Sequence, residues 1–256
     1  MNSSLQTKGE VLVVGGSGSM GWPICRALIA DGYQVISLTR GIHPRPEEYA
    51  LHLNGTTQKV PLREISCNVT SINSDHLLND IWIKLSRPLS AIVYAVGDCP
   101  PGKFDSAVKL PLCDIDDGIL SHELNIHVIG LLNVVRKLHT CLQPSGHVVV
   151  ISSAITRLTD ATCPPWLHAG HYAAAKAAQD ELVRWFRRDP CIKDRNILVH
   201  RLAPAAVDTP FHQGCEHQPP AMLSVDDVAQ RVLDALQSTA VIDEIMMPPQ
   251  ATIIAG

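Results

Sequence analysis

Short runs of aliphatic and β-branched residues alternate along this chain with longer segments in which apolar residues recur at helical spacing. The runs predict seven strands, within VLVVGG (11–16), YQVISLTR (33–40), VPLREISCNVT (60–70), SAIVYAVG (90–97), GHVVVISSA (146–154), NILVHRLAP (196–204) and IDEIMMPP (242–249). The helical pattern is clearest in PICRALIADG (23–32), HELNIHVIGLLNVVRKLHTCL (122–142), GHYAAAKAAQDELVRWF (170–186) and VDDVAQRVLDALQ (225–237). Uniformly apolar strands suit a sheet covered on both faces, and their alternation with helices indicates βαβ units. The pattern therefore predicts an α/β fold with a parallel sheet, formed by one domain over residues 1–256.

Composition narrows the class of protein. The chain has 256 residues, of which 46% are hydrophobic and 4% aromatic, and its net charge is −4. An acidic chain without a basic stripe, and with few rings to stack on bases, is not expected to bind nucleic acid. Its eight cysteines include no C-x-x-C pair, which indicates reduced thiols rather than a disulfide framework. The N-terminus is polar and the apolar runs are too short to cross a bilayer, so we expect no membrane partner and a cytoplasmic location.

A glycine-rich turn follows the first predicted strand directly. The stretch GGSGSMG (15–21) contains the pattern G-x-G-x-x-G and leads into a helix. Glycines at such a turn let the backbone approach a pyrophosphate closely, and the N-terminus of the helix favours negative charge. The string alone also fits an ordinary tight turn, but its position between the first strand and the first helix predicts a dinucleotide site.

The end of the second strand bears on the choice of dinucleotide. An acidic residue at this place would bind the ribose 2′-hydroxyl of NAD. The strand instead ends in Leu38, Thr39 and Arg40, and a guanidinium can bind a 2′-phosphate through two hydrogen bonds. Arg45 could assist from the following loop. Arg40 could also lie in solvent at an ordinary strand end, but the lack of an acid favours NADP(H) over NAD(H).

A tyrosine and a lysine stand four residues apart in the helix 170–186, with three alanines between them. Tyr172 and Lys176 therefore share one face of that helix. Both side chains could simply extend into solvent. Alternatively, the ammonium stabilises the phenolate and lowers the pKa of the tyrosine, which makes it a proton donor near neutral pH. The alanines leave that face thin, so that a cofactor and a substrate can approach.

The glycine turn, the tyrosine–lysine pair and several motifs between them resemble, in order, the short-chain dehydrogenase/reductase family in its roughly 250-residue single-domain form. The other motifs are CNVT after the third strand, YAVG after the fourth, Asn125 in the long helix, VISSA in the fifth strand and APAAVDTP after the sixth. The resemblance covers nearly the whole chain. It implies a Rossmann-type doubly wound parallel sheet in a three-layer αβα sandwich, assembled as a homodimer or homotetramer.

The resemblance also implies a role for each matched residue. Tyr172 would donate a proton, Lys176 would hold the nicotinamide ribose, Ser153 would bind the substrate oxygen, and Asn125 would hold a water that links Lys176 to solvent. The cofactor would be bound by the glycine turn and by the segments that follow the strands. The implied contacts are Gly15, Ser17, Gly18, Ser19, Met20, Gly21, Arg40, Asn68, Val69, Ala95, Val96, Gly97, Tyr172, Lys176, Pro204, Val207 and Thr209. Alternatively, Ser153 could be an ordinary turn residue at the end of the strand, and Asn125 could serve only in helix packing.

The chain departs from the family pattern on the cofactor side. Ser19 replaces the middle glycine of the turn, and Asn68 replaces the aspartate beside the adenine. In the motif after the fourth strand only Gly97 is kept. Tyr94, in the same motif, is expected to bring a large ring near the adenosine.

The chain also departs from the family pattern on the substrate side. Eighteen residues separate Ser153 from Tyr172, more than the family usually has. We expect the segment 156–171 to shape the mouth of the substrate site together with the loop 209–222. The Pro, Trp and Leu residues of these loops hint at an apolar substrate.

A metal site is the weaker alternative for part of this region. His212, Cys215 and His217 in FHQGCEH could in principle bind zinc. A fourth ligand is missing at an obvious spacing, so we expect no metal.

The resemblance and the motifs together predict an NADP(H)-dependent oxidoreductase that reduces a small ketone or aldehyde to an alcohol. Two alternatives stay open at this point. One is an NAD-linked secondary-alcohol dehydrogenase that uses the same residues. The other is a regulator that binds a dinucleotide without turnover.

Overall fold

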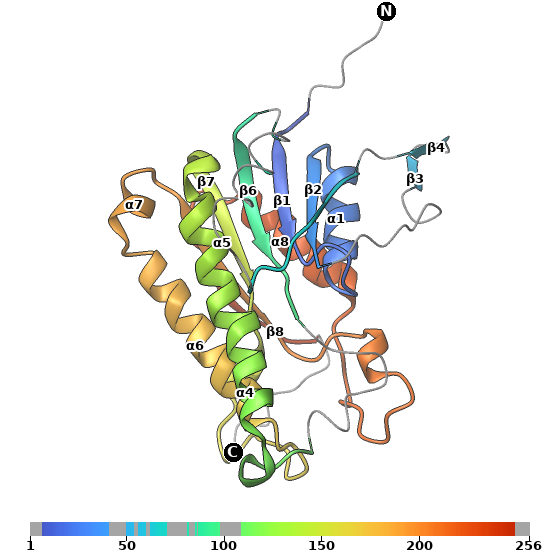
Figure 1. Ribbon diagram of the computed structural model, residues 1–256. Helices are drawn as coiled ribbons and strands as arrows, with labels where there is room; N and C mark the ends of the chain where they lie inside the picture. The colour runs from blue at the N-terminus through green and yellow to red at the C-terminus, as the bar shows by residue number, and fades with distance from the viewer. Residues whose placement is uncertain are drawn as a thin grey trace, which may run out of the picture.

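The centre of the protein is a seven-stranded parallel sheet in the order β5-β2-β1-β6-β7-β8-β9 (Figure 1). The computed structural model describes residues 7–40, 50–53, 56–59, 62–70, 81, 85, 87–97 and 109–248. The strands of the sheet are β1 Glu10–Val14, β2 Gln34–Thr39, β5 Leu62–Ser66, β6 Leu89–Tyr94, β7 Leu142–Ile151, β8 Leu198–Pro204 and β9 Asp243–Met246. Each overlaps one of the seven predicted segments, so the predicted α/β fold with a doubly wound parallel sheet is confirmed.

The strand order reverses at β1, which lies between β2 and β6. In sheets of this kind a crevice opens at the reversal, beyond the carboxyl ends of the strands. The glycine turn follows β1, Arg40 follows β2, the segment 95–97 follows β6 and Ser153 follows β7. Parallel strands end at the same edge of the sheet, so the sheet gathers these separate segments at one edge.

Helices cover both faces of the sheet (Figure 1). One face carries α1 (Gly21–Ala30) and α8 (Val225–Gln237), which also contact each other. The other carries α5 (Gly130–Leu138) and α6 (Gly170–Phe186), with α4 (Asp117–Leu124) packed against α6 and a short α7 (Pro190–Lys193) before β8. The bounds of α6 and α8 are those predicted from the sequence. This arrangement is the expected three-layer αβα sandwich.

Alternation along the strands divides the core between the two faces. Leu12 and Val14 of β1 belong to the cluster under α5 and α6, whereas Val11 and Val13 belong to the cluster under α1 and α8. All four side chains are at most 1% exposed. Burying an aliphatic side chain of this size contributes about 1.5–3 kcal/mol, so both layers of helices are held by the same strands.

An antiparallel pair of short strands, β3 (Ala50–Leu53) and β4 (Thr56–Lys59), forms a separate two-stranded sheet. No pattern in the sequence predicted this pair. The segment between β2 and β5 is rich in polar residues and lacks the aliphatic runs that mark the central strands.

The long helix predicted over 122–142 is interrupted by a π-helical turn at Asn125–Ile129, which joins α4 to α5. The N–H of Gly130 donates to the carbonyl of Asn125, five residues back instead of four. Side chains from other elements donate to two carbonyls of this turn. The hydroxyl of Tyr94 lies 2.5 Å from the Ile126 carbonyl oxygen, and Gln179 Nε2 lies 3.2 Å from that of His127. The turn is therefore fixed to both β6 and α6.

The helical stretch Asp117–Cys141 is, by length and composition alone, apolar enough to cross a membrane. A helix that covers the sheet of a soluble protein meets the same criterion. Within this stretch, four side chains of α5 pack into the core beneath it, namely Leu131, Val134, Val135 and Leu138.

Two histidines stack on each other between β7 and β8, with ring centroids 5.3 Å apart. His200 Nδ1 accepts a hydrogen bond from the Ile242 N–H at 3.0 Å, so this nitrogen carries no proton. His200 Nε2 therefore donates to His147 Nδ1, 3.0 Å away. Burial, followed by the neighbouring His147 and Arg187, lowers the pKa of His200 to about 4, and burial also lowers the pKa of His147.

The stability of the protein should consequently fall as the pH drops below about 6.5. The unfolded chain binds protons near the usual pKa of histidine, whereas folded His200 does not bind one until about pH 4. His200 alone should then cost about 2 kcal/mol of unfolding free energy between pH 7 and pH 5. Urea unfolding at pH 7, 6 and 5 measures this loss. In His200→Asn the amide oxygen can still accept from Ile242 but does not titrate, so the loss should shrink; an equal loss in both proteins would contradict the assignment.

Candidate active site

The glycine turn forms a tight cradle at the carboxyl end of β1. Gly15 has a φ of +85°, which L side chains rarely adopt, and a Cβ there would lie 2.9 Å from the carbonyl oxygen of Ala95. A Cβ on Gly21 would collide with the carbonyl oxygen of Gly15. Gly18 and Ser19 are exposed at the open side of the turn. Helix α1 starts at Gly21 with no acidic residue in its first turn, so its positive end is not opposed by a carboxylate there. The cradle fits a pyrophosphate.

The other predicted cofactor residues near β2 and β5 lie at the same edge of the sheet. Arg40 is exposed just after β2, and its carbonyl accepts a hydrogen bond from Ser66 Oγ at 3.3 Å. Arg45 lies outside the described residues. Asn68 is exposed, and its Oδ1 accepts from the N–H and the hydroxyl of Thr70 at 3.1 and 2.8 Å. Val69 is 6% exposed and packs into the core under α5, where its carbonyl oxygen accepts a hydrogen bond from Asn133 Nδ2 at 3.2 Å.

Tyr94 does not lie beside the adenosine, as the sequence had led us to expect. It is the last residue of β6 and is fully buried among the core residues under α5, where its hydroxyl donates to the Ile126 carbonyl. Side chains alternate along a strand, and Tyr94 has the same parity as Ile92, which faces that core. Gly130 makes room for it, since a Cβ there would lie 2.5 Å from the Tyr94 hydroxyl oxygen.

The remaining predicted cofactor contacts follow β6 and β8. Ala95 and Val96 are half-buried, and Gly97 is exposed with open space around its Cα. Pro204 ends β8 and is buried, Val207 pairs with Leu223 in an isolated bridge, and Thr209 is 9% exposed.

Tyr172 and Lys176 lie in the first two turns of α6, facing the sheet. Lys176 is 3% exposed, and its Nζ lies 5.7 Å from the centroid of the Tyr172 ring. The ammonium donates to the carbonyl oxygen of Ile151 at 3.1 Å and to Oε1 of Gln179 at 3.1 Å. Both acceptors are neutral, so these two hydrogen bonds hold the ammonium near the half-buried phenol without cancelling its positive charge.

Two serines at the end of β7 have different surroundings. Ser152 is buried and donates to Asp180 Oδ1. Ser153 is half-buried, and its Oγ accepts from the N–H of Ile155 at 3.3 Å. That contact leaves the hydroxyl hydrogen of Ser153 able to donate to a further group.

The side chain of Asn125 is exposed at the start of the π-helical turn, unlike the other three predicted catalytic residues. Two residues later, His127 is 1% exposed, and its ring meets that of Tyr172 edge to face with centroids 5.6 Å apart. His127 Nε2 donates to Glu123 Oε2 at 3.1 Å. Burial, followed by the nearby Lys176, lowers the pKa of His127 to about 4, so the ring is neutral at pH 7.

Sequence reasoning missed both His127 and Gln179, although the apolar stripes contained a signal for each. His127 precedes Leu131, Val134 and Leu138 at helical spacing, and that stripe faces the core, whereas Asn125 lies off it. Gln179 follows Lys176 on the stripe that continues to Val183 and Phe186, and it is fully buried. A polar residue on a buried stripe must have a hydrogen-bond partner, so a polar residue in such a stripe is a candidate for a functional contact.

Tyr172 also packs against an apolar cluster. Tyr172 belongs to a small cluster around Ala169 that also contains Ile155, Trp166, Leu167, Phe211 and Cys215. Apart from Tyr172 itself and Ile155, which lies in the short helical turn after β7, these residues come from the segments 156–171 and 209–222.

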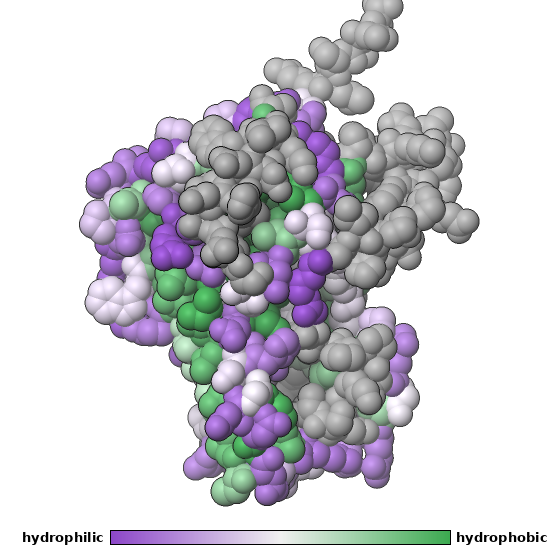
Figure 2. All heavy atoms as spheres, viewed as in Figure 1, coloured by the Kyte–Doolittle hydropathy of each residue, from purple (hydrophilic) through white to green (hydrophobic). Residues whose placement is uncertain are grey.

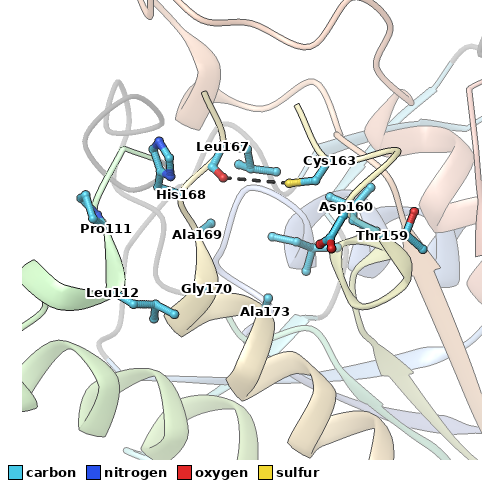
Figure 3. A pocket seen from close by; sticks show the side chains of 12 residues that line it. Pro111, Leu112, Thr159, Asp160, Cys163, Leu167, His168, Ala169, Gly170 and Ala173 are labelled. Atoms are coloured by element: carbon cyan, nitrogen blue, oxygen red, sulfur yellow. Dashed lines mark hydrogen bonds between the residues drawn. The ribbon is translucent and has the colours of Figure 1, made fainter. Parts of the chain in front are cut away.

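A cavity of about 380 Å³ lies next to this cluster, at the start of α6 (Figure 3). Leu112, Leu158, Asp160 and His168 are among its lining residues, and Ala173 closes it on the helix side. Cys163 donates from its Sγ to the carbonyl oxygen of Leu167 across one wall, at 4.0 Å. Tyr172 and Ser153 do not line this cavity.

The three residues considered for zinc are not gathered into a metal-binding group in the described part of the chain. Cys215 Sγ donates to the carbonyl oxygen of Phe211 at 3.7 Å. The ring of His217 lies against Trp166, with centroids 5.4 Å apart.

The family model described as short chain dehydrogenase matches residues 10–220. No curated protein matches the sequence.

Several solved structures share the fold at low sequence identity. An alcohol dehydrogenase from Thermococcus sibiricus complexed with 5-hydroxy-NADP is 20% identical with a TM-score of 0.73, over 93% of this chain and 95% of that one. A short-chain dehydrogenase from Burkholderia cenocepacia J2315 in complex with NADP is 17% identical with a TM-score of 0.70, over 94% and 89%. A short-chain dehydrogenase/reductase from Serratia marcescens BCRC 10948 is 17% identical with a TM-score of 0.72, over 94% and 98%.

Proposed function

The chain belongs to the short-chain dehydrogenase family of oxidoreductases, and we propose that it uses NADP(H) to reduce a small ketone or aldehyde to an alcohol. The observation that carries this proposal is the pair on α6, a half-buried phenol beside a buried ammonium that donates to two neutral acceptors. Such a cation favours the phenolate, so the tyrosine can release its proton near neutral pH.

In this mechanism the residues of the chain handle the proton and the developing negative charge. NADPH, when bound, supplies the hydride. Tyr172 donates its phenolic proton to the carbonyl oxygen, and Lys176 stabilises the phenolate that remains. Ser153 donates its hydroxyl hydrogen to the same oxygen, because its Oγ already accepts from Ile155. Asn125, whose side chain is exposed at the start of the π-helical turn, would hold a water that links Lys176 to solvent.

The cofactor would be held by the cradle and by the segments at the carboxyl edge of the sheet. Gly15 and Gly21 let the backbone of the turn pack closely against itself and against the segment after β6, and the N-terminus of α1 favours the charge of a pyrophosphate. Two of the similar solved structures, those from Thermococcus sibiricus and Burkholderia cenocepacia, contain NADP or a derivative of it.

The experiment that tests the function is a screen of carbonyl compounds against purified protein, following loss of NADPH absorbance. The apolar cluster around Tyr172 favours uncharged substrates, so cyclic and aryl ketones should be reduced and α-keto acids should not. The screen could show no NADPH consumption with ketones or α-keto acids and no NADH formation from secondary alcohols. That outcome would favour a regulator that binds the dinucleotide without turnover.

Replacing Arg40 should change the choice of cofactor. In Arg40→Asp, affinity for NADPH should fall about 10–100-fold, because a charge-assisted contact is lost and a carboxylate repels the 2′-phosphate. Affinity for NADH should stay the same or improve, since a carboxylate can bind the 2′-hydroxyl. Calorimetric titration with both cofactors gives the two values. Arg26→Asp, at an exposed site on α1, is the matched control; equal losses in the two variants would refute the assignment of Arg40.

We also propose that the chain forms homodimers or homotetramers through the helices on the α5 and α6 face. Figure 2 shows hydrophobic surface along α4 and α5. Leu120, Ile129 and Trp185 are 37%, 40% and 55% exposed on α4, the π-helical turn and α6. Apolar side chains gathered on one face favour association.

A further inference from the structure

Gln179 is a fully buried amide next to the proposed proton donor. It lies on α6, three residues after Lys176, and is 0% exposed. A buried amide requires partners for both its oxygen and its NH₂ group. Here Oε1 accepts from Lys176 Nζ at 3.1 Å, and Nε2 donates to the carbonyl oxygen of His127 at 3.2 Å. The amide therefore connects the lysine to the π-helical turn.

His127 contacts both members of the pair on α6. Its ring lies against the ring of Tyr172, and its carbonyl reaches Lys176 through the amide of Gln179. The ring is held from the other side by Glu123. The π-helical turn is thus attached to the phenol by one contact and to the ammonium by another.

The charge of Lys176 explains why an amide suits this position. An ammonium that is 3% exposed needs acceptors in place of water, and the Ile151 carbonyl is only one of those it uses. An apolar side chain at position 179 would remove an acceptor and let the lysine shift. A carboxylate would accept the hydrogen bond but would neutralise the charge that favours the phenolate. A neutral acceptor holds the cation and leaves its charge in place.

We propose that Gln179 is a positioning residue, which holds the Lys176 ammonium beside Tyr172 without neutralising it and uses the His127 carbonyl as its anchor. The inference rests on the proposed function only for the role of Tyr172 as the proton donor. Other titratable groups on the elements around the pair are the same in every variant of position 179. On α4 they are Asp117, His122 and Glu123, and on α6 they are His171, Asp180, Glu181 and Arg184; His127 in the π-helical turn and Tyr94 on β6 complete the set on these four elements.

The test is the titration of Tyr172 in the full-length chain, followed by NMR with ¹³C at Cζ of tyrosine. The chain has four tyrosines, and the Tyr172 signal is the one that is lost in Tyr172→Phe. In Gln179→Glu the titration midpoint of Tyr172 should rise by about one pH unit or more, because the new carboxylate offsets the ammonium. In Gln179→Met, which has nearly the same shape but no acceptor, it should rise by less. The exposed Gln230→Glu on α8 is the control and should leave the midpoint unchanged.

A midpoint in either folded Gln179 variant that equals that of the unchanged chain would overturn the proposal. If Gln179→Glu does not fold, the Gln179→Met variant decides. The titration needs no turnover, so a protein that reduces no carbonyl compound would contradict the proposed function without affecting this test. If Gln179 were only structural, both variants would lower stability. The titration midpoint of Tyr172 would then not rise in the order unchanged chain, Gln179→Met, Gln179→Glu.

Discussion

Tyr172→Phe should reduce the rate of carbonyl reduction about a thousandfold, the effect expected when a general acid is removed from a site that is otherwise intact. The substitution deletes one hydroxyl and keeps the ring that packs against His127 and the cluster around Ala169. Affinity for NADPH should change by less than about threefold, since most of the proposed cofactor contacts lie on other segments. Steady-state kinetics and calorimetric titration give the two quantities on the same preparation.

Tyr33→Phe is the matched control for this prediction. Tyr33 is also half-buried and also lies near a lysine, with Lys8 Nζ 6.0 Å from its ring centroid, but it precedes β2 at the opposite end of the strands. Its loss should leave the rate unchanged. A Tyr172→Phe protein that retains full activity would exclude Tyr172 as the proton donor, and with it the proposed mechanism.

Asp180→Ala should lower the free energy of unfolding by about 1.5–3 kcal/mol, because the buried Arg201 loses one charged partner and keeps only Asp243. Asp180 Oδ2 accepts from Arg201 Nη1 at 2.8 Å and from Thr156 Oγ1 at 3.0 Å, while Oδ1 accepts from Ser152. The side chains of Asp180 and Arg201 are only 16% and 5% exposed. The carboxylate therefore joins α6 to β8 and to the end of β7 that carries Ser153.

Asp234→Ala provides the comparison for an exposed ion pair. Asp234 pairs with Arg231 on α8, and both side chains are more than a third exposed. Its loss should cost less than about 1 kcal/mol. Urea unfolding of the two variants at pH 7 measures the difference; equal costs would mean that the Asp180 network contributes no more than a surface pair.

The fold was predictable because its signals are local. Each central strand is a short aliphatic run, and α6 and α8 have apolar residues at helical spacing over their whole length. Ser224 and Asp227 form a capping box that marks the start of α8 in the sequence. The hairpin of β3 and β4 lacked such a signal, because its residues are mostly polar.

The direction of single side chains was harder to predict. Tyr94 was placed beside the cofactor by its position in the motif after the fourth strand. It points into the core instead, because the packing of the chain decides which face of β6 meets α5. A π-helical turn adds a residue to one turn of a helix and rotates the residues after it about the helix axis. Asn125 lies exposed at the start of this turn, while His127 within it meets Tyr172.

By itself the sequence determined the α/β class, the order of the strands along the chain, the glycine turn and the spacing of Tyr172 and Lys176. All of these depend on residues within a few positions of one another, where backbone geometry alone sets which side chains are neighbours. Only the tertiary structure decided which groups surround that pair. The Gln179 amide, the His127 carbonyl and the bond of Asp180 to Arg201 join α6 to the π-helical turn and to β8, segments whose contact depends on the packing of the whole sheet.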